Sequence, residues 1–315
     1  MTVWILFIVA ILIFLALDLG IFNKNAHIIK PKEAGIWTAI WVTLSFLFSF
    51  AINWIYSNNY ISNPTNIKPA VATMKFITGY LIELSLSIDN IFIIAVIFAS
   101  FKIPQKYQHR VLFWGILGAI LFRGLMIFFG VILINKFSWM TYFFGAFLIF
   151  TAFKMLFKKE EEEEFNPKKS FVYRTLRKIT PVTSHIEGEF FFVKKKHLRV
   201  ATPLFVSLIV IEVMDMLFAL DSVPAILAIT ADPFLVFSSN IFAILGLRSM
   251  YFFLANMIEK FSYLENSLIV ILSFVGIKML VVHFYKFPEW VSISVITLSL
   301  VTGIIISIRK SKTDN

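Results

Sequence analysis

The sequence predicts an all-α integral membrane protein of about nine transmembrane helices, in which two three-helix units form an inverted repeat. Composition is the first observation: the 315 residues are 59% hydrophobic and 15% charged, against about 45–50% and about 25% in soluble domains. The mean hydropathy of +0.83 is the second. The third is that apolar windows long enough to span a bilayer recur, and two of them carry the same acidic pattern.

Windows of about 20 apolar residues predict the individual helices. They fall at residues 2–22, 36–56, 74–100, 111–134, 138–157, 203–230, 235–257, 265–285 and 290–308. The first window has no basic start and no small-residue cleavage site, and it contains Asp18. We therefore expect a retained helix there and not a signal peptide.

Basic residues predict how the chain lies in the membrane. Lys and Arg gather in the loops at 23–35, 101–110 and 158–200 and in the tail, whereas the loops between them are poor in charge. Because positive loops face the cytoplasm, we expect a multi-pass protein of the cell membrane with its N-terminus outside and its C-terminus inside. Topology and contact with lipid headgroups explain the net charge of +10, so nucleic acid is not an expected partner.

The predicted organisation has four parts: membrane helices at 1–157, a cytoplasmic loop at 158–200, membrane helices at 201–308 and a cytoplasmic tail at 309–315. In the loop, the acidic run Glu160–Glu164 is expected to be a solvated linker. Basic residues at helical spacing predict a short surface helix over Phe171–Ile179. The stretch 189–202 is expected to form a small hairpin.

Two segments in the apolar windows read as copies of each other. Glu83-Leu-Ser-Leu-Ser-Ile-Asp89-Asn90 and Asp215-Met-Leu-Phe-Ala-Leu-Asp221-Ser222 each place two carboxylates six residues apart, followed by a small polar residue. A carboxylate at membrane depth costs roughly 2.5 to 3.5 kcal/mol, so it is rare unless it faces a partner, a cavity or an ion path. The repeated segments are therefore a site hypothesis.

Basic residues follow these acids in the same order. Arg123 and Arg248 lie in the next predicted helix of each copy, and Lys154 and Lys278 lie in the helix after that. The repeat units are thus about 74–157 and about 203–285. Because each has three spans, the second unit enters from the opposite face, and inverted repeats of this kind are typical of transporters with a site near the bilayer midplane.

The chemistry of these side chains favours a hard divalent cation. The chain has no Cys, and carboxylate, amide and hydroxyl oxygens suit Mg²⁺, Ca²⁺ and Mn²⁺. The candidate metal ligands are Glu83, Asp89, Asn90, Glu212, Asp215, Asp221 and Ser222. The candidates for charge pairing or gating are Asp18, Arg123, Arg248, Lys154 and Lys278. Met214 and Met216 flank Asp215, where a thioether favours Mn²⁺ unless it serves packing alone.

Helix geometry leaves two alternatives for the paired acids. On an unbroken helix, Asp221 points about 120° away from Asp215. Either the acids serve two neighbouring surfaces, or the helix is locally opened. Pro224 favours opening in the second copy, because it removes the hydrogen bond to the Leu220 carbonyl.

The chain resembles the TerC family at these motifs. The resemblance is carried by the first acidic segment, by Asp215-Met-Leu-Phe-Ala-Leu-Asp221-Ser-Val-Pro-Ala and by Ser-Ser-Asn240-Ile-Phe-Ala-Ile-Leu-Gly-Leu-Arg248, and it covers nearly the whole length. The family was named for tellurium resistance, and members are implicated in manganese export. The resemblance implies that the candidate metal ligands match the family's functional acidic motifs. Other relatives are linked to membrane-protein insertion and to metal loading of secreted enzymes.

We therefore expect a secondary transporter that exports a divalent cation, with Mn²⁺ as the favoured ion, in exchange for protons. The chain carries no phosphate-binding glycine motif, so we expect no coupling to ATP, no enzymatic activity and no permanently bound cofactor. The alternative is a membrane scaffold or assembly factor that contacts the secretion machinery through residues 158–200. The lipid bilayer is a partner in either case.

Overall fold

The computed structural model describes most of the chain, namely residues 2–20, 29–137, 139–157, 167–183, 186, 188–195, 198–254, 264–282, 284–285 and 287–311. The side chains of Asp18 and Asp89 lie outside the described part, although their backbones belong to helices. The predicted linker Glu160–Glu164 and the last residues of the tail also fall outside it.

Nine long helices in the described part follow the nine predicted spans. They are α1 (Thr2–Gly20), α2 (Pro31–Ser57), α3 (Pro69–Ser100), α4 (Gln105–Lys136), α5 (Met140–Leu156), α7 (Pro203–Leu227), α8 (Pro233–Leu254), α9 (Leu264–Val281) and α10 (Glu289–Ser311). Six of them are long and apolar enough to cross a membrane, and α1, α5 and α9 contribute shorter apolar stretches. The predicted all-α membrane class is confirmed.

Local sequence explains where several of these helices begin. The first residue of α2, α3 and α7 is a proline, which is tolerated there because the first N–H of a helix has no partner within it. At the start of α8, the Asp232 carboxylate accepts hydrogen bonds from the backbone N–H groups of Phe234 at 3.0 Å and Leu235 at 3.2 Å. This is an N-cap, which satisfies donors that the helix itself leaves open.

The predicted opening of the helix near Pro224 is wrong. The α7 helix runs without interruption from Pro203 to Leu227, with Pro224 in its last turn. The Ala228 N–H donates to the Pro224 carbonyl at 3.0 Å, so helical bonding continues past the proline. Pro224 has no N–H to donate to the Leu220 carbonyl, but the loss of this one hydrogen bond does not interrupt the helix, which continues to Leu227. Asp215 and Asp221 therefore both lie on regular helical backbone.

The helix contacts follow the symmetry that the repeat predicts. Helix α3 packs against α8, and its repeat equivalent α7 packs against α4, the equivalent of α8. The equivalent pairs α3 and α7, α4 and α8, and α5 and α9 are also in contact. Exchanging the two three-helix units leaves this pattern of contacts unchanged, as expected for two units of similar structure.

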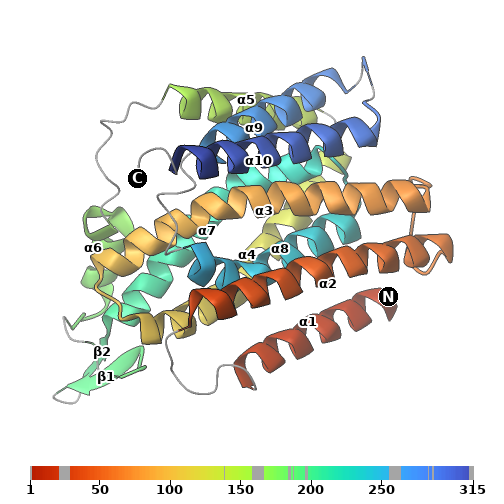
Figure 1. Cartoon of the computed structure of the whole chain (residues 1–315). Coiled ribbons are helices and arrows are strands. Elements are labelled where there is room, and N and C mark those ends of the chain that lie inside the picture. Colours follow the sequence, from red (N-terminus) through yellow and green to blue (C-terminus); the bar gives the residue numbers. More distant parts are fainter. Residues whose placement is uncertain are drawn as a thin grey trace.

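Three helices outside the units break this symmetry. Helix α2 covers α3 and α8, whereas α10 covers α9 and α3. Helix α1 lies at the edge of the bundle, where the Phe7 ring packs against Phe48 on α2 and Phe234 on α8 (Figure 1). No described helix outside the units covers α4 and α5 to a comparable extent. The first unit is therefore the more exposed on its outer side.

The polar segment gathers at one end of the bundle, which we call the hairpin end (Figure 1). It contains the short helix η1 (Pro167–Lys169), the predicted helix α6 (Phe171–Ile179), and the antiparallel strands β1 (Phe192–Lys195) and β2 (Leu198–Ala201). The Ser170 side chain caps α6 by accepting from the Tyr173 N–H at 3.2 Å. Both the surface helix and the hairpin are confirmed.

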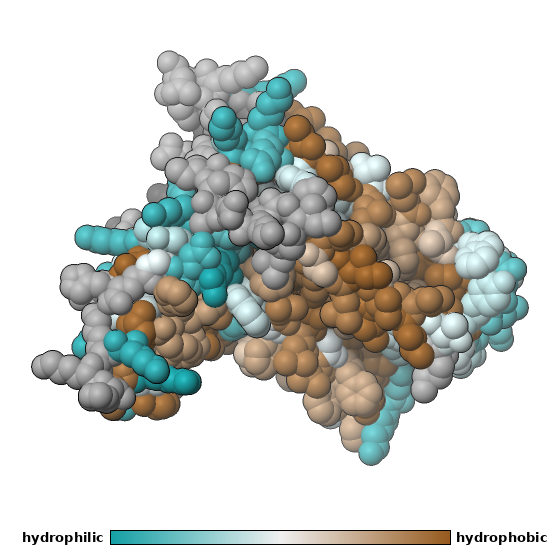
Figure 2. Space-filling view, turned by 90° about the horizontal axis from the view of Figure 1, so that it is seen from below, coloured by the Kyte–Doolittle hydropathy of each residue, from teal (hydrophilic) through white to brown (hydrophobic). Residues whose placement is uncertain are grey.

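The surface is apolar along the helices and polar at their ends. Figure 2 shows a broad hydrophobic area between hydrophilic groups at both ends of the molecule. Large apolar side chains such as Leu6, Phe50 and Phe128 are more than half exposed. A continuous apolar surface of this size suits lipid and is not found on soluble monomers.

Candidate functional site

A buried arginine joins two of the predicted acids at the centre of the bundle. The Arg123 guanidinium on α4 donates to both carboxylate oxygens of Asp215 on α7, from Nε at 3.0 Å and from Nη2 at 2.7 Å. It also forms an ion pair with Glu83 on α3. The side chains of Arg123 and Glu83 are 1% and 0% exposed, so protein groups and not water stabilise these charges.

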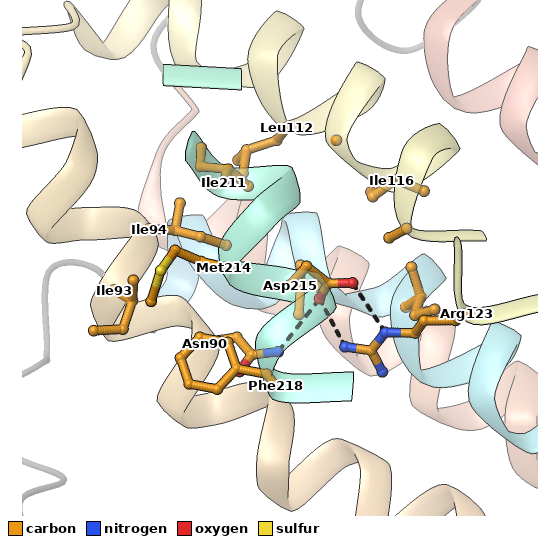
Figure 3. A pocket seen from close by; sticks show the side chains of 14 residues that line it. Asn90, Ile93, Ile94, Leu112, Ile116, Arg123, Ile211, Met214, Asp215 and Phe218 are labelled. Carbon is orange, nitrogen blue, oxygen red and sulfur yellow. Dashed lines mark hydrogen bonds and ion pairs between the residues drawn. The ribbon is translucent and has the colours of Figure 1, made fainter. Parts of the chain in front are cut away.

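Two asparagine side chains extend this arrangement. The Asn90 amide on α3 lies 3.5 Å from Asp215, and the Asn240 amide on α8 donates to Glu83 at 3.1 Å. Figure 3 shows Asn90 and Arg123 on opposite sides of the Asp215 carboxylate. We call Glu83, Asn90, Arg123, Asp215 and Asn240 the central cluster. It lies near the middle of α3, α4, α7 and α8, where the two repeat units meet.

Sequence reasoning did not select Asn240, although a signal for it exists. Ser238, Ser239 and Asn240 form a polar triplet inside an apolar span. The two serine hydroxyls donate to carbonyls of their own helix, whereas the Asn240 side chain crosses to α3. A polar residue that avoids its own backbone within a membrane helix is a marker of tertiary contact.

Several buried oxygen atoms near these acids have no hydrogen-bond partner among the described residues. They include Asn90 Oδ1, Asn240 Oδ1, Ser222 Oγ and Glu212 Oε2. Asn240 is fully buried and Asn90 is 4% exposed. Buried acceptors without a donor are uncommon in folded proteins, and each calls for an explanation such as an ion or a water molecule.

Glu212 lies one turn from Asp215 but is not part of the central cluster. Its carboxylate packs against Gly118 on α4, where a Cβ atom would lie within 2.4 Å of all three carboxyl atoms. Real side chains do not approach this closely, so a residue larger than glycine at position 118 would displace the carboxylate. Gly118 therefore makes room for Glu212.

Asp221 faces a different neighbour from Asp215. The Thr151 hydroxyl on α5 donates to the Asp221 carboxylate at 3.0 Å, and Lys154 on the same helix interacts with it electrostatically. The structure thus places the two acids of α7 on two surfaces, the first of the alternatives that the helical periodicity left open. Ser222, beside Asp221, is 1% exposed.

The two predicted arginines have different surroundings. Arg123 belongs to the central cluster, whereas Arg248 lines a separate small cavity with Glu33, Trp37 and Trp41 of the N-terminal part of the chain. Arg248 is 6% exposed. Its counterpart Arg123 is in contact with acids from both repeat units, and Arg248 is not a member of that cluster.

The two predicted lysines also differ. Lys278 is buried and donates to Ser292 Oγ at 2.9 Å and to Glu289 Oε2 at 3.4 Å, both on α10. Glu289 also pairs with Lys75 on α3 at 3.4 Å. Lys154, by contrast, is exposed. Of these two candidates for charge pairing, Lys278 is buried in an ion pair, whereas Lys154 is exposed.

The central cluster leaves little free space in this conformation. A cavity of about 20 Å³ lies beside Asn90, Arg123, Met214 and Asp215, with otherwise apolar walls (Figure 3). This volume accommodates about one water molecule. Within the described part of the chain, no group of three or more His, Cys, Asp or Glu side chains is arranged to hold a metal ion.

Comparison with known proteins places the chain in a family. The model of the integral membrane protein TerC family matches residues 69–315, which is more than three quarters of the sequence. The chain belongs to the TerC family. The family match begins at the first residue of α3, so it contains both repeat units and α10.

Relatives in the TerC family match almost the whole chain. An uncharacterized membrane protein of Myxococcus xanthus, STKORF319, is 47% identical over 98% of this chain and 92% of its own length. An uncharacterized membrane protein of Rickettsia bellii is 44% identical over 99% of both chains. In Escherichia coli K12, a protein named as a proposed membrane-bound redox modulator, Alx, is 45% identical over 96% of this chain and 93% of its own. No solved structure matches the chain.

Proposed function

We propose that this TerC-family protein is a secondary transporter that exports a divalent metal cation from the cytoplasm, with Mn²⁺ as its best substrate. The observation that carries the proposal is the central cluster itself. Two carboxylates, Glu83 and Asp215, come from equivalent helices of two inverted units and meet with two amides near the middle of the bundle. Inverted-repeat transporters bind their substrates at such a junction.

The donor atoms of the cluster suit a hard or borderline cation. Carboxylate and amide oxygens bind Mg²⁺, Ca²⁺ and Mn²⁺. Met214 lines the cavity beside Asp215 (Figure 3), and a thioether there would favour Mn²⁺ over the two harder ions. Met216, the other flanking methionine, is 37% exposed and has no part in this preference.

The proposal excludes catalysis and needs no permanently bound cofactor. The chain contains no cysteine, so thiol–disulfide exchange of the kind suggested by a redox name cannot take place on this chain. We propose instead that export is driven by exchange for protons, because carboxylates are the membrane-embedded groups that can carry protons as well as metal ions.

Flux measurements with purified protein in liposomes test the proposal. We expect Mn²⁺ to cross faster than Ca²⁺ or Mg²⁺, and faster with an opposing pH gradient than without one. Glu83→Gln and Asp215→Asn should each lower Mn²⁺ flux by about tenfold or more, because each removes a buried charged ligand. Asp89→Asn and Asp221→Asn test the remaining pair of the repeated motif.

The matched control is Glu189→Gln. Glu189 also pairs with an arginine, Arg110 at 2.9 Å, but the two side chains are 33% and 36% exposed at the hairpin end. Its substitution should leave Mn²⁺ flux unchanged. Equal flux through protein-containing and protein-free liposomes for all three ions would refute the transport proposal.

A scaffold function is the competing proposal, and one observation favours it. Phe171 and Ile179 of α6, at the hairpin end of the bundle, are 82% and 74% exposed. Such exposure is expected for a helix that meets a membrane surface or a partner. A scaffold predicts that replacing both residues with serine abolishes activity in cells, while Asp215→Asn does not. The transport proposal predicts the reverse.

A further inference from the structure

The guanidinium of Arg123 occupies the position that a bound cation would take. It lies between Glu83 and Asp215, the equivalent acids of the two repeat units, and donates to both Asp215 oxygens. The charges of Glu83 and Asp215 sum to −2 without it, and a divalent cation would neutralise both. In this conformation a single positive charge from the protein itself takes the place of that cation.

The surrounding oxygen atoms are suited to a metal ion and not to the arginine. Asn90 and Asn240 each use the amide nitrogen toward a carboxylate, and the carbonyl oxygen of each is buried without a partner among the described residues. A guanidinium has donors to offer, yet those of Arg123 are directed at the two carboxylates. The two acceptors remain unused, which is costly for buried polar atoms.

Space prevents the arginine and a metal ion from binding together. The adjoining cavity of about 20 Å³ is lined by Asp215 but not by Glu83, so an ion in it would not bridge the two acids. A cation coordinated by Glu83 and Asp215 would have to lie where the guanidinium now lies. Occupation by Arg123 and occupation by a metal ion are therefore mutually exclusive.

We propose that Arg123 is a tethered counter-ion that competes with the transported metal ion for Glu83 and Asp215. Metal binding displaces the guanidinium, and the carbonyl oxygens of Asn90 and Asn240 complete the ligand set. When the metal leaves, the guanidinium returns and compensates the empty site during the conformational change back. This inference rests on the transport function proposed above. It also identifies Asn240 as a ligand.

The equivalent arginine of the second unit has different neighbours among the described residues. Arg248, the equivalent of Arg123, lines the cavity with Glu33 and Trp37 and not the central cluster. Exchange for protons then involves carboxylates outside the Arg123 pair, such as Glu212, whose carboxylate packs against Gly118 on the same helix as Arg123.

Two variants of Arg123 test the competition. Mn²⁺ binding to purified protein is measured by electron paramagnetic resonance with Mn²⁺ alone, and liposome assays compare net Mn²⁺ flux with Mn²⁺–Mn²⁺ exchange. Arg123→Gln should bind Mn²⁺ about tenfold more tightly than wild type, because its competitor is gone. It should retain exchange, in which the protein changes conformation only with the site occupied, and lose net flux, which requires a return with the site empty. Arg123→Lys keeps the charge and should restore net flux.

The proposal would be overturned if folded Arg123→Gln bound Mn²⁺ no more tightly than wild type. It would also be overturned if this variant lost net flux and exchange in parallel. Should Arg123→Gln fail to fold, a second variant tests the proposed ligand set. Asn240→Ala should lower Mn²⁺ affinity by about tenfold, while Ser238→Ala on the same helix, whose hydroxyl bonds only its own backbone, should not. Equal affinities for these two variants would refute the ligand role of Asn240.

The two proposals fail in different ways. Wild-type protein that moves no divalent cation refutes the transport function, whereas the competition between Arg123 and Mn²⁺ is decided by binding alone. The other outcome is that wild-type protein transports Mn²⁺ and Arg123→Gln matches it in binding, exchange and net flux. This outcome would refute the counter-ion role of Arg123 and leave the transport function intact.

Discussion

Lys154 and Lys278 hold the same place in the two repeat units, yet one is exposed and the other is buried in an ion network. Each follows an aromatic or aliphatic residue and precedes Met-Leu near the end of its helix. Lys278 lies between Glu289 and Ser292 of α10, whereas Lys154 has no such helix beside it in the described part of the chain. The sequence repeat is thus more regular than the environments that it produces.

The difference comes from the helices outside the repeat. Helix α10 packs on α9 and supplies the partners of Lys278, while α2 packs on α8 and lines the cavity of Arg248. In the described part of the chain, no helix outside the repeat packs on α4 and α5 in this way. The basic residues of the first unit accordingly have different neighbours. Arg123 pairs with acids of the central cluster, and Lys154 is exposed. The helices outside the repeat therefore give equivalent basic residues different partners.

The largest expected effect is the loss of Lys278. Lys278→Met leaves Glu289 with Lys75 as its one cation among the described residues and removes the donor to the buried Ser292 hydroxyl. We expect the free energy of unfolding to fall by about 3 kcal/mol, since breaking a buried ion pair is strongly destabilising. Thermal unfolding in detergent, followed by tryptophan fluorescence, measures the change.

Lys154→Met is the control, because it is the same change at the equivalent position. An exposed lysine contributes little, and we expect a change below about 0.5 kcal/mol. Equal losses for the two variants would mean that the burial of Lys278 has no energetic consequence and that the comparison of the two units is wrong.

The contact between the units predicts the next largest effect. Helices α5 and α9 meet at Gly145 and Gly276, where a Cβ on Gly276 would lie 2.7 Å from Ile149 Cγ1 and 2.9 Å from the Gly145 carbonyl oxygen. Gly276→Ala should therefore destabilise the protein by about 2 kcal/mol, because backbone cannot move aside as a flexible side chain can. The same unfolding assay measures it.

Gly246→Ala on α8 is the matched substitution. The nearest atom to its new Cβ would be Trp41 Cβ at 3.6 Å, an ordinary contact. Alanine is also the better helix former, so this variant should be neutral or slightly more stable. Destabilisation of both variants to the same degree would show that the close approach of α5 and α9 does not decide the effect.

Much of the fold was predictable because hydropathy alone determines which segments enter a membrane. The nine predicted windows all became helices within the described part of the chain, and Phe171–Ile179 became α6 at the predicted residues. The predicted opening at Pro224 was wrong because the loss of one hydrogen bond at the proline did not interrupt α7, which continues to Leu227.

The candidate site was less predictable, since it depends on which helices meet. Periodicity showed that Asp215 and Asp221 face different directions, but only packing reveals that one faces Arg123 and the other Thr151. Asn240 was missed because it lies outside the repeated motif. The roles of Asp18 and Asp89 stay predictions, because their side chains lie outside the described residues.

The smallest expected effect comes from making the two units more alike. Thr151 is aligned with Val275 when Lys154 is aligned with Lys278, and its hydroxyl donates to Asp221. Thr151→Val keeps the shape and removes this hydrogen bond, so we expect a stability loss of about 1 kcal/mol. Mn²⁺ flux in liposomes should fall further than stability does if Asp221 must be held in place for the ion to pass. Unchanged flux would assign Thr151 to packing alone, and the second acidic surface of α7 would then have no demonstrated part in transport.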